Sequence, residues 1–238
     1  MTTPSRLPLL LLPGLINDAR LWLSQVSQLS DIADAKVGDL TVADSIPDLA
    51  AAVLAQAPAE RFALAGLSMG GYVAMEIMRQ APERVIALAL LDTSASADTP
   101  EAVEGRRKLM ELAEMDFPAV IATLLPKMVH PSQVDDAAVG GVFKAMAFSV
   151  GKRAFLSQQR AILGRIDSRP SLAKIACPSL VLCGREDVLT PVAVHEEIAA
   201  GIAGSRLVVI EECGHLSTLG QPRQVTLALR QWLLSTRH

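Results

Sequence analysis

The chain has 238 residues, of which 50% are hydrophobic and only 3% aromatic, and its formal net charge is −3. This length is enough for one domain with a substantial core, built mainly from Leu, Ala, Val, Ile and Met. Acidic and basic residues are mixed along the sequence, so the basic stripe that nucleic acid or an anionic membrane would need is missing. We therefore expect neither nucleic acid nor a membrane as a partner.

The three cysteines are Cys177, Cys183 and Cys213, an odd number without the short spacing of metal ligands. We expect no metal, no disulfide framework and a reducing, cytoplasmic location. Cys213 lies two residues before a histidine, but a small buried side chain is the simpler interpretation.

The apolar run Leu7–Leu12 follows Arg6 and has some likeness to a secretory signal. No small-residue cleavage site comes after it; instead Asn17, Asp18 and Arg20 follow. No other apolar run approaches the ~20 residues of a membrane span. The run is therefore predicted to be the first strand of the fold.

Short apolar runs alternate with helical patterns along the chain, which predicts parallel strands connected by helices. The predicted strands are Leu7–Leu12, Ala35–Leu40, Phe62–Ala65, Val85–Leu91, Ser179–Cys183 and Arg206–Ile210. Helices are predicted at about 19–30, 47–57, 69–80, 191–203 and 222–235. Several strands are apolar throughout, as expected when helices cover both faces of a sheet. The sequence thus predicts an α/β fold with about six strands.

Residues 97–168 interrupt this alternation, because they show helical pattern without a convincing strand. Such a stretch is too long for a simple connection. We predict an insertion of about four helices, packed over the carboxyl edge of the sheet.

The segment Gly66-Leu67-Ser68-Met69-Gly70 follows a predicted strand and begins a predicted helix. This is the context of a G-x-S-x-G nucleophile elbow, in which a sharp turn exposes the serine hydroxyl. The helix N-terminus favours negative charge that develops nearby. Ser68 is the predicted nucleophile.

A serine nucleophile needs a base, and His215 is the best candidate. It lies on the loop between the last predicted strand and the last helix, at the same sheet edge as Ser68. His130 lies in the insertion, His195 in a helix and His238 at the terminus, so we expect all three to be structural or solvated.

The base needs an acid to orient it. Asp187 comes after the predicted strand Ser179–Cys183, and its position in the chain lies between Ser68 and His215. This gives the order Ser…Asp…His. Asp92 ends the strand Val85–Leu91 on the same edge and competes for the role. We favour Asp187 and expect Asp92 to accept hydrogen bonds from loop amides.

An oxyanion intermediate needs backbone donors. The amide of Met69, directly after the nucleophile, is one candidate. The other is the amide of Leu15 in the loop after the first strand, where Gly14 allows close approach of the substrate.

Together these residues resemble the α/β-hydrolase superfamily over nearly the whole chain outside the insertion. The elbow, the Gly184…Asp187…Pro191 loop and the Gly214-His215 pair before the last helix occur in the family's order. Among its members the chain is similar to small capped carboxylesterases such as the pimeloyl carrier-protein methyl esterases. The resemblance implies a core of residues 1–96 and 169–238, a helical cap of residues 97–168 and a Ser-Asp-His triad.

Three features depart from that family pattern. Pro13-Gly14 stands where His-Gly is common, and residues 39–44 lack the usual Asp-x-Arg-Gly-x-Gly loop. The leading β-hairpin is also missing, since only six residues precede the first strand, so we expect about six strands, all parallel.

The predicted reaction is hydrolysis of a carboxylic ester with a small or medium apolar acyl group, through an acyl-enzyme and without a cofactor. Trp22, Phe143 and Met146 are predicted to contact this small-molecule substrate. The basic run 106–108 is a possible docking patch for an acidic carrier protein, although such a run is more often a solvated helix face. A thioesterase or a carbon–carbon or lactone hydrolase would use the same machinery. A small-molecule receptor with slow turnover is the alternative from another class.

Overall fold

The structure is a computed structural model that describes residues 6–236. Six parallel strands form one sheet in the order β2-β1-β3-β4-β5-β6. They are β1 (Leu7–Leu12), β2 (Ala33–Val37), β3 (Phe62–Leu67), β4 (Val85–Leu91), β5 (Ser179–Gly184) and β6 (Arg206–Ile210). The predicted α/β fold with an all-parallel six-stranded sheet is confirmed.

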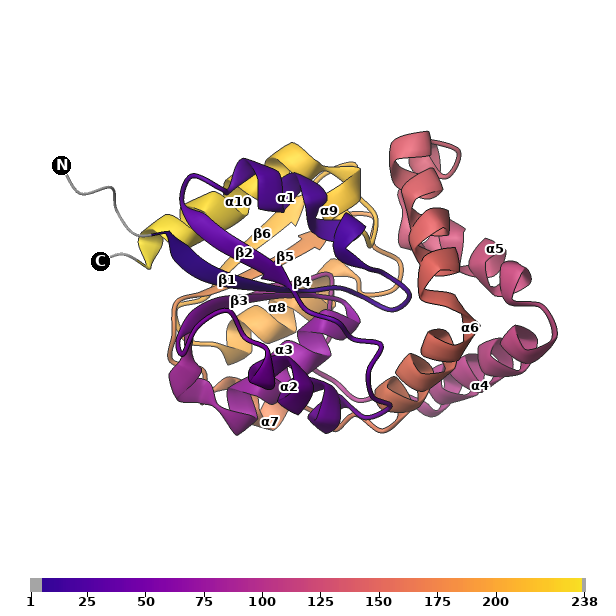
Figure 1. Ribbon diagram of the computed structural model, residues 1–238, viewed down its shortest axis with the longest axis horizontal. Coiled ribbons are helices and arrows are strands. Elements are labelled where there is room, and N and C mark those ends of the chain that lie inside the picture. Colours follow the sequence, from indigo (N-terminus) through magenta and orange to yellow (C-terminus); the bar gives the residue numbers. More distant parts are fainter. Residues whose placement is uncertain (1–5, 237–238) are drawn as a thin grey trace.

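Helices cover both faces of the sheet (Figure 1). One layer contains α1 (Leu23–Gln28), α9 (Ser217–Gly220) and α10 (Pro222–Ser235); the other contains α2 (Ile46–Ala55), α3 (Met69–Gln80), α7 (Arg169–Leu172) and α8 (Val192–Gly201). Short 3-10 turns lie at Ala19–Trp22, Pro82–Arg84 and Pro131–Gln133. Every residue of β3 and β5 is buried, which explains why these strands are apolar throughout.

One strand begins and ends earlier than predicted. The predicted strand Ala35–Leu40 is found as β2, Ala33–Val37, which lies at the sheet edge and pairs with β1 alone. The side chain of Asp39 accepts a hydrogen bond from the Thr41 amide at 2.9 Å. This local turn competes with the extended conformation, so the strand ends before Asp39.

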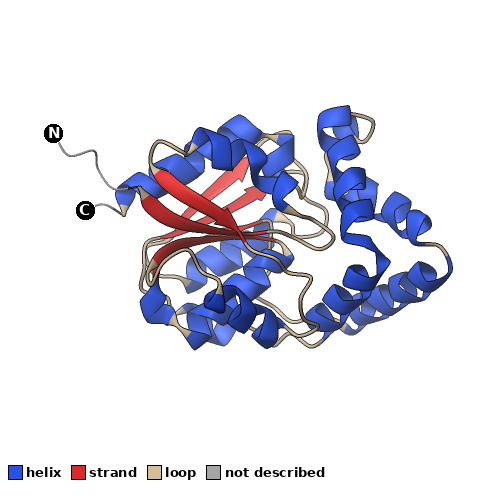
Figure 2. Ribbon diagram, in the orientation of Figure 1, coloured by secondary structure: helices blue, strands red, loops and turns tan. Residues whose placement is uncertain are grey.

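The chain between β4 and β5 forms helices beyond the ends of the strands (Figure 2). These are α4 (Pro100–Met115), α5 (Phe117–Met128), a π-helical turn (Ala137–Gly141) and α6 (Val142–Leu163). Thr99 caps α4 by accepting from the Ala102 amide at 3.3 Å, and Asp116 caps α5 through the Ala119 amide at 3.0 Å. Gly151 adopts a φ of 79° and interrupts α6, which divides it into two helical parts.

The parallel strands place their following loops at one edge of the sheet, and α4 to α6 lie beyond this edge (Figure 1). The loops after β1, β3, β4, β5 and β6 carry the residues discussed below. None of the helices in the described part of the chain combines the length and the apolar character that crossing a bilayer requires.

Candidate active site

Ser68 occupies the turn between β3 and α3, with φ 55° and ψ −116°. A non-glycine residue in such a conformation costs about 1–3 kcal/mol and persists only when its surroundings fix it. The Ser68 amide donates to the Leu91 carbonyl at 2.9 Å, and the Thr93 hydroxyl donates to the Ser68 carbonyl at 2.8 Å. The end of β4 therefore holds the strained turn in place.

Two glycines allow the strand and helix around Ser68 to pack closely. A Cβ on Gly66 would lie 2.3 Å from the Gly70 carbonyl oxygen, and a Cβ on Gly70 would lie 2.3 Å from the Leu12 carbonyl oxygen. Both distances are shorter than any real carbon–oxygen contact, so these positions require glycine. The spacing of the elbow thus reflects the close approach of β1, β3 and α3.

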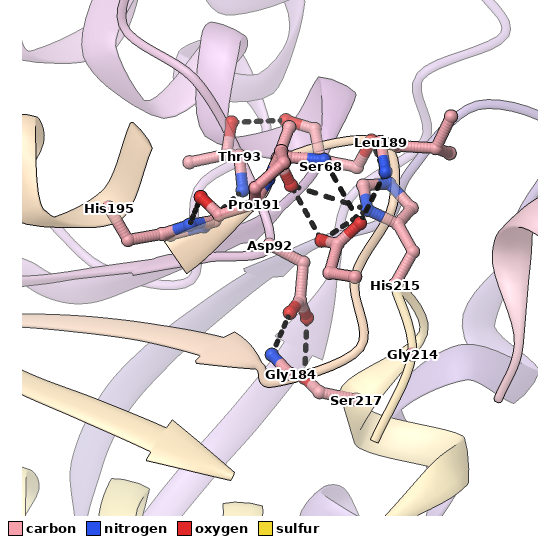
Figure 3. Close-up of polar contacts among 12 residues, drawn as sticks. Ser68, Asp92, Thr93, Gly184, Leu189, Pro191, His195, Gly214, His215 and Ser217 are labelled. Carbon is pink, nitrogen blue, oxygen red and sulfur yellow. Dashed lines mark hydrogen bonds and ion pairs between the residues drawn. The ribbon is translucent and has the colours of Figure 1, made fainter. Parts of the chain in front are cut away.

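His215 reaches Ser68 from the loop after β6 (Figure 3). Its Nε2 lies 2.8 Å from Ser68 Oγ, and its Nδ1 lies 2.8 Å from Asp187 Oδ2. The structure therefore brings Ser68, His215 and Asp187 into one continuous chain of hydrogen bonds, although they lie far apart in the sequence.

The Asp187 carboxylate is held by its own loop after β5. Its Oδ1 accepts from the amides of Leu189 at 2.8 Å and Thr190 at 3.0 Å, and its Oδ2 accepts from the Thr190 hydroxyl at 2.6 Å. These donors fix the carboxylate and favour its ionised form.

The charges of Asp187 and His215 support each other in a buried setting. Burial opposes ionisation of Asp187, but His215 and the loop donors outweigh it and lower the pKa of this carboxyl. Burial likewise opposes protonation of His215, but the Asp187 carboxylate outweighs it and raises the pKa of the imidazole. His215 is thus a stronger base than an ordinary histidine.

Asp92 has other partners. Its Oδ1 accepts from the Gly184 amide at 3.0 Å, and its Oδ2 lies 2.5 Å from the Ser217 hydroxyl. Burial, together with the nearby Asp187 charge, raises the pKa of Asp92 to about 8. The acid bonded to His215 is Asp187, while Asp92 connects β5 with α9.

His195, expected to be structural or solvated, is buried on α8 and contacts the loop that holds the nucleophile turn, a contact that the sequence did not predict. Its Nε2 accepts a hydrogen bond from the Thr93 amide at 2.9 Å, and burial lowers the pKa of His195 to about 4. Thr93 in turn holds the Ser68 carbonyl (Figure 3). His130 pairs with Ser132, and His238 lies outside the described residues. No sequence signal marks His195, since its partner is 102 residues away.

The two amides predicted to stabilise an oxyanion are Leu15 and Met69, and neither has a hydrogen-bond acceptor within residues 6–236. Leu15 sits in a turn closed by the Asn17 amide on the Gly14 carbonyl at 3.2 Å. The next amide, of Ile16, donates to Gln158 Oε1 on α6 at 2.9 Å. The turn is thereby fixed with the Leu15 amide left unpaired.

A cavity of about 420 Å³ is lined by Ser68, Leu15 and His215, among other residues. Apolar side chains from α4 to α6 line much of it, namely Leu109, Leu124, Met128 and Ile162. This is the size and character of a small-molecule site.

The three residues predicted to contact a substrate do not line this cavity. Trp22, Phe143 and Met146 are fully buried and pack in the hydrophobic core. Large apolar side chains stabilise a core as well as a pocket, and the sequence pattern does not distinguish the two uses. The prediction for these three residues is therefore corrected in favour of a packing role.

Arg106, part of the predicted docking run, also lies elsewhere than expected. Its guanidinium lines the cavity and pairs with Asp98 at 2.6 Å, whereas Arg107 is exposed. The run thus divides between the cavity and the outer face of α4.

The sequence matches the alpha/beta hydrolase family over residues 9–229, and the chain belongs to this family. The fold and the arrangement of Ser68, His215 and Asp187 agree with a hydrolase of this class.

Relatives of known name are similar to the chain at moderate identity. The pimeloyl-[acyl-carrier protein] methyl ester esterase of Nitrosomonas europaea is 28% identical over 188 residues, which cover 76% of this chain and 74% of the relative. The 2-hydroxy-6-oxo-6-phenylhexa-2,4-dienoate hydrolase of Comamonas testosteroni is 30% identical over 66% of this chain and 57% of the relative. The structure of a thermophilic esterase from Thermogutta terrifontis, with malate bound, superposes with a TM-score of 0.90 and 29% identity, covering 99% of this chain and 92% of that one.

Proposed function

We propose that the chain is a serine hydrolase that cleaves carboxylic esters through an acyl-enzyme. The observation that carries this proposal is the 2.8 Å contact between Ser68 Oγ and His215 Nε2, with Asp187 bonded to the other ring nitrogen. Ser68 and His215 lie at the wall of a cavity, in the positions of a nucleophile and its base, and Asp187 contacts His215 from the side away from Ser68.

In the first step Ser68 Oγ attacks the ester carbonyl carbon while His215 Nε2 takes the hydroxyl proton. The carbonyl oxygen becomes an oxyanion, which accepts hydrogen bonds from the unpaired amides of Leu15 and Met69. Each such donor contributes about 3 kcal/mol to the transition state. Met69 begins α3, so the helix dipole adds to the same stabilisation.

The tetrahedral intermediate then collapses, and His215 donates its proton to the departing alcohol. Water attacks the acyl-enzyme with His215 again as base, which releases the carboxylic acid and restores Ser68. Asp187 keeps Nδ1 protonated, so that Nε2 faces the serine in the correct tautomer. It also stabilises the imidazolium during both steps.

Similarity to other proteins supports an ester as the substrate class. Two proteins similar to this chain are named esterases. The cavity's apolar wall from α4 to α6 fits an acyl group of small or medium length. We accordingly propose residues 97–168 as a cap that selects the substrate, and residues 1–96 and 169–238 as the catalytic core. Arg107 and Lys108 are exposed, and a carrier protein remains a further candidate partner for this face.

Hydrolysis of p-nitrophenyl esters from acetate to decanoate tests the proposal. Wild type should turn over repeatedly, and Ser68→Ala should lose the activity. A thioester and a lactone in the same panel assign the leaving group. Single-turnover or undetectable hydrolysis across the panel would favour a slow-turnover receptor instead, and an active Ser68→Ala variant would exclude the mechanism.

A further inference from the structure

The cavity that contains Ser68 has a strongly basic part. Its charged lining residues, apart from His215, are Asp98, Arg106, Lys127 and Arg165, an excess of two positive charges. This contrasts with the whole chain, whose net charge is −3. The Arg165 side chain is 7% exposed and the Arg106 side chain 21% exposed, and guanidinium groups shielded to this degree are costly to desolvate. A cavity that served only an apolar acyl group would have no use for them.

Asp98 is shared by the two arginines. Its carboxylate lies 2.6 Å from Arg106 Nε and 2.8 Å from Arg165 Nη2. Burial opposes its ionisation, but the hydrogen bonds from Arg165 and Arg106 outweigh burial and lower the pKa of Asp98. One carboxylate therefore balances two guanidinium groups, and within residues 6–236 one positive charge is left without a counter-ion.

The arginines are held rigidly. The Arg165 side chain is only 7% exposed, and its guanidinium stacks over the Tyr72 ring at 4.4 Å. Arg106 Nη1 donates to Gln159 Oε1 at 3.1 Å. The donors at this end of the cavity are thus oriented before any ligand binds.

Gln159 supplies the observation that points to a ligand. The side chain is fully buried, and because its Oε1 accepts from Arg106, its Nε2 carries two hydrogens toward other groups. Within residues 6–236 this Nε2 has no acceptor. Buried donors without a partner are rare in proteins. Asn17 Nδ2 and Trp22 Nε1 are also unpaired within residues 6–236, but of these residues Gln159 alone lines the cavity.

We propose that Arg106 and Gln159 bind a carboxylate of the substrate, with Arg165 and Asp98 holding them in position. The substrate is then an ester that carries a carboxylate in addition to its scissile group. A guanidinium and an adjacent amide N–H match the two oxygens of a carboxylate. This inference rests on the proposed esterase function and adds an anionic group, on the acyl or the alcohol side of the ester, to the proposed substrate.

The test compares charged and neutral esters of equal length at about pH 8, where carboxylates are ionised. The first series is the monomethyl esters of the dicarboxylic acids from succinate to adipate against the corresponding dimethyl esters. The second series is the acetate esters of hydroxy acids against the acetate esters of their methyl esters. The first places the carboxylate on the acyl side and the second on the alcohol side.

In at least one series we expect kcat/KM for the charged ester to exceed that of its neutral partner about 10- to 100-fold, as hydrogen bonds to charged groups produce. Arg106→Gln should reduce this ratio to near one. Gln159→Glu should do the same, because it supplies Arg106 with an internal counter-ion. The matched control is Arg107→Gln, which removes a charge from the exposed face of the same helix and should leave the ratio unchanged.

Far-UV circular dichroism and thermal melting verify that each variant is folded. If only one of Arg106→Gln and Gln159→Glu folds, that variant suffices to compare kcat/KM for charged and neutral esters. Equal kcat/KM for charged and neutral esters in both series would overturn the inference while leaving the esterase proposal intact. If wild type hydrolyses nothing, calorimetric titration of Ser68→Ala separates the two proposals. Tighter binding of the charged esters would then support the carboxylate site without the esterase, and equal or absent binding would reject the site as well.

Discussion

His215 Nδ1 lies 2.8 Å from Asp187 Oδ2, and both side chains are almost completely shielded from solvent, with 2% and 0% exposure. Water does not screen the pair, and the loop donors to Asp187 keep its negative charge in place. The imidazole is consequently oriented toward Ser68 and made more basic at the same time.

Asp187→Asn should lower kcat for a p-nitrophenyl ester by about 10⁴-fold, because the amide favours the wrong imidazole tautomer and carries no charge. Steady-state kinetics on the purified variant measures the effect. Asp92→Asn is the matched control, since the same substitution one loop away leaves the His215–Asp187 contact untouched. A larger loss of kcat in Asp92→Asn than in Asp187→Asn would make Asp92 the orienting acid.

The pH dependence of kcat/KM should follow the raised pKa of His215. The base must be neutral, so activity falls as protonation sets in on the acid side, and this limb should lie above the ordinary imidazole value of 6.5. In Asp187→Asn the limb should move to lower pH, because the charge that raises the pKa is gone. Activity measured from about pH 5 to about pH 9 shows the acid limb of wild type and that of Asp187→Asn. If the two limbs lie at the same pH, Asp187 is not the charge that raises the pKa of His215.

Asp92 should make the protein less stable as the pH rises from about 4 to about 8. Its pKa is about 8 in the folded chain and near 3.8 when exposed, so folding takes up a proton in this window and higher pH opposes folding. Asp92→Asn mimics the protonated form and should remove this part of the pH dependence. Urea unfolding of both proteins across the window measures it; parallel stability curves for wild type and variant would refute it.

The nucleophile turn is predictable from sequence because its constraints are local. The strand, the helix and the close contact between Gly66 and Gly70 all fall within a few residues of Ser68, and only the contact of Gly70 with Leu12 involves a distant strand. His215 and Asp187 are predictable because the parallel sheet places the loops after its strands at one edge, whatever the details of the loops.

The lining of the cavity depends on packing between segments that are distant in the sequence, and residue type does not reveal this packing. Phe143 and Met146 have the composition of a pocket wall but pack in the core, while Arg106, in a run that looked like a solvated face, turns into the cavity. The contacts of Gln159 are equally invisible in the sequence, since its partner Arg106 is 53 residues away.

His195→Phe should destabilise the protein, because it leaves the Thr93 amide buried without an acceptor. Loss of one partner from a buried hydrogen bond costs about 1–3 kcal/mol. Urea unfolding near neutral pH measures the loss, and His130→Phe, which changes a histidine without such a buried partner, is the control.

His195 should also affect how the free energy of unfolding changes at acid pH. The pKa of His195 is about 4 in the folded chain and near 6.5 when exposed, so the unfolded chain binds the extra proton between these values. As the pH falls from about 6.5 to about 4, wild type should therefore lose more stability than His195→Phe loses. If the difference in stability between the two proteins stays constant from about pH 7 to about pH 4, His195 is not a buried neutral acceptor for Thr93.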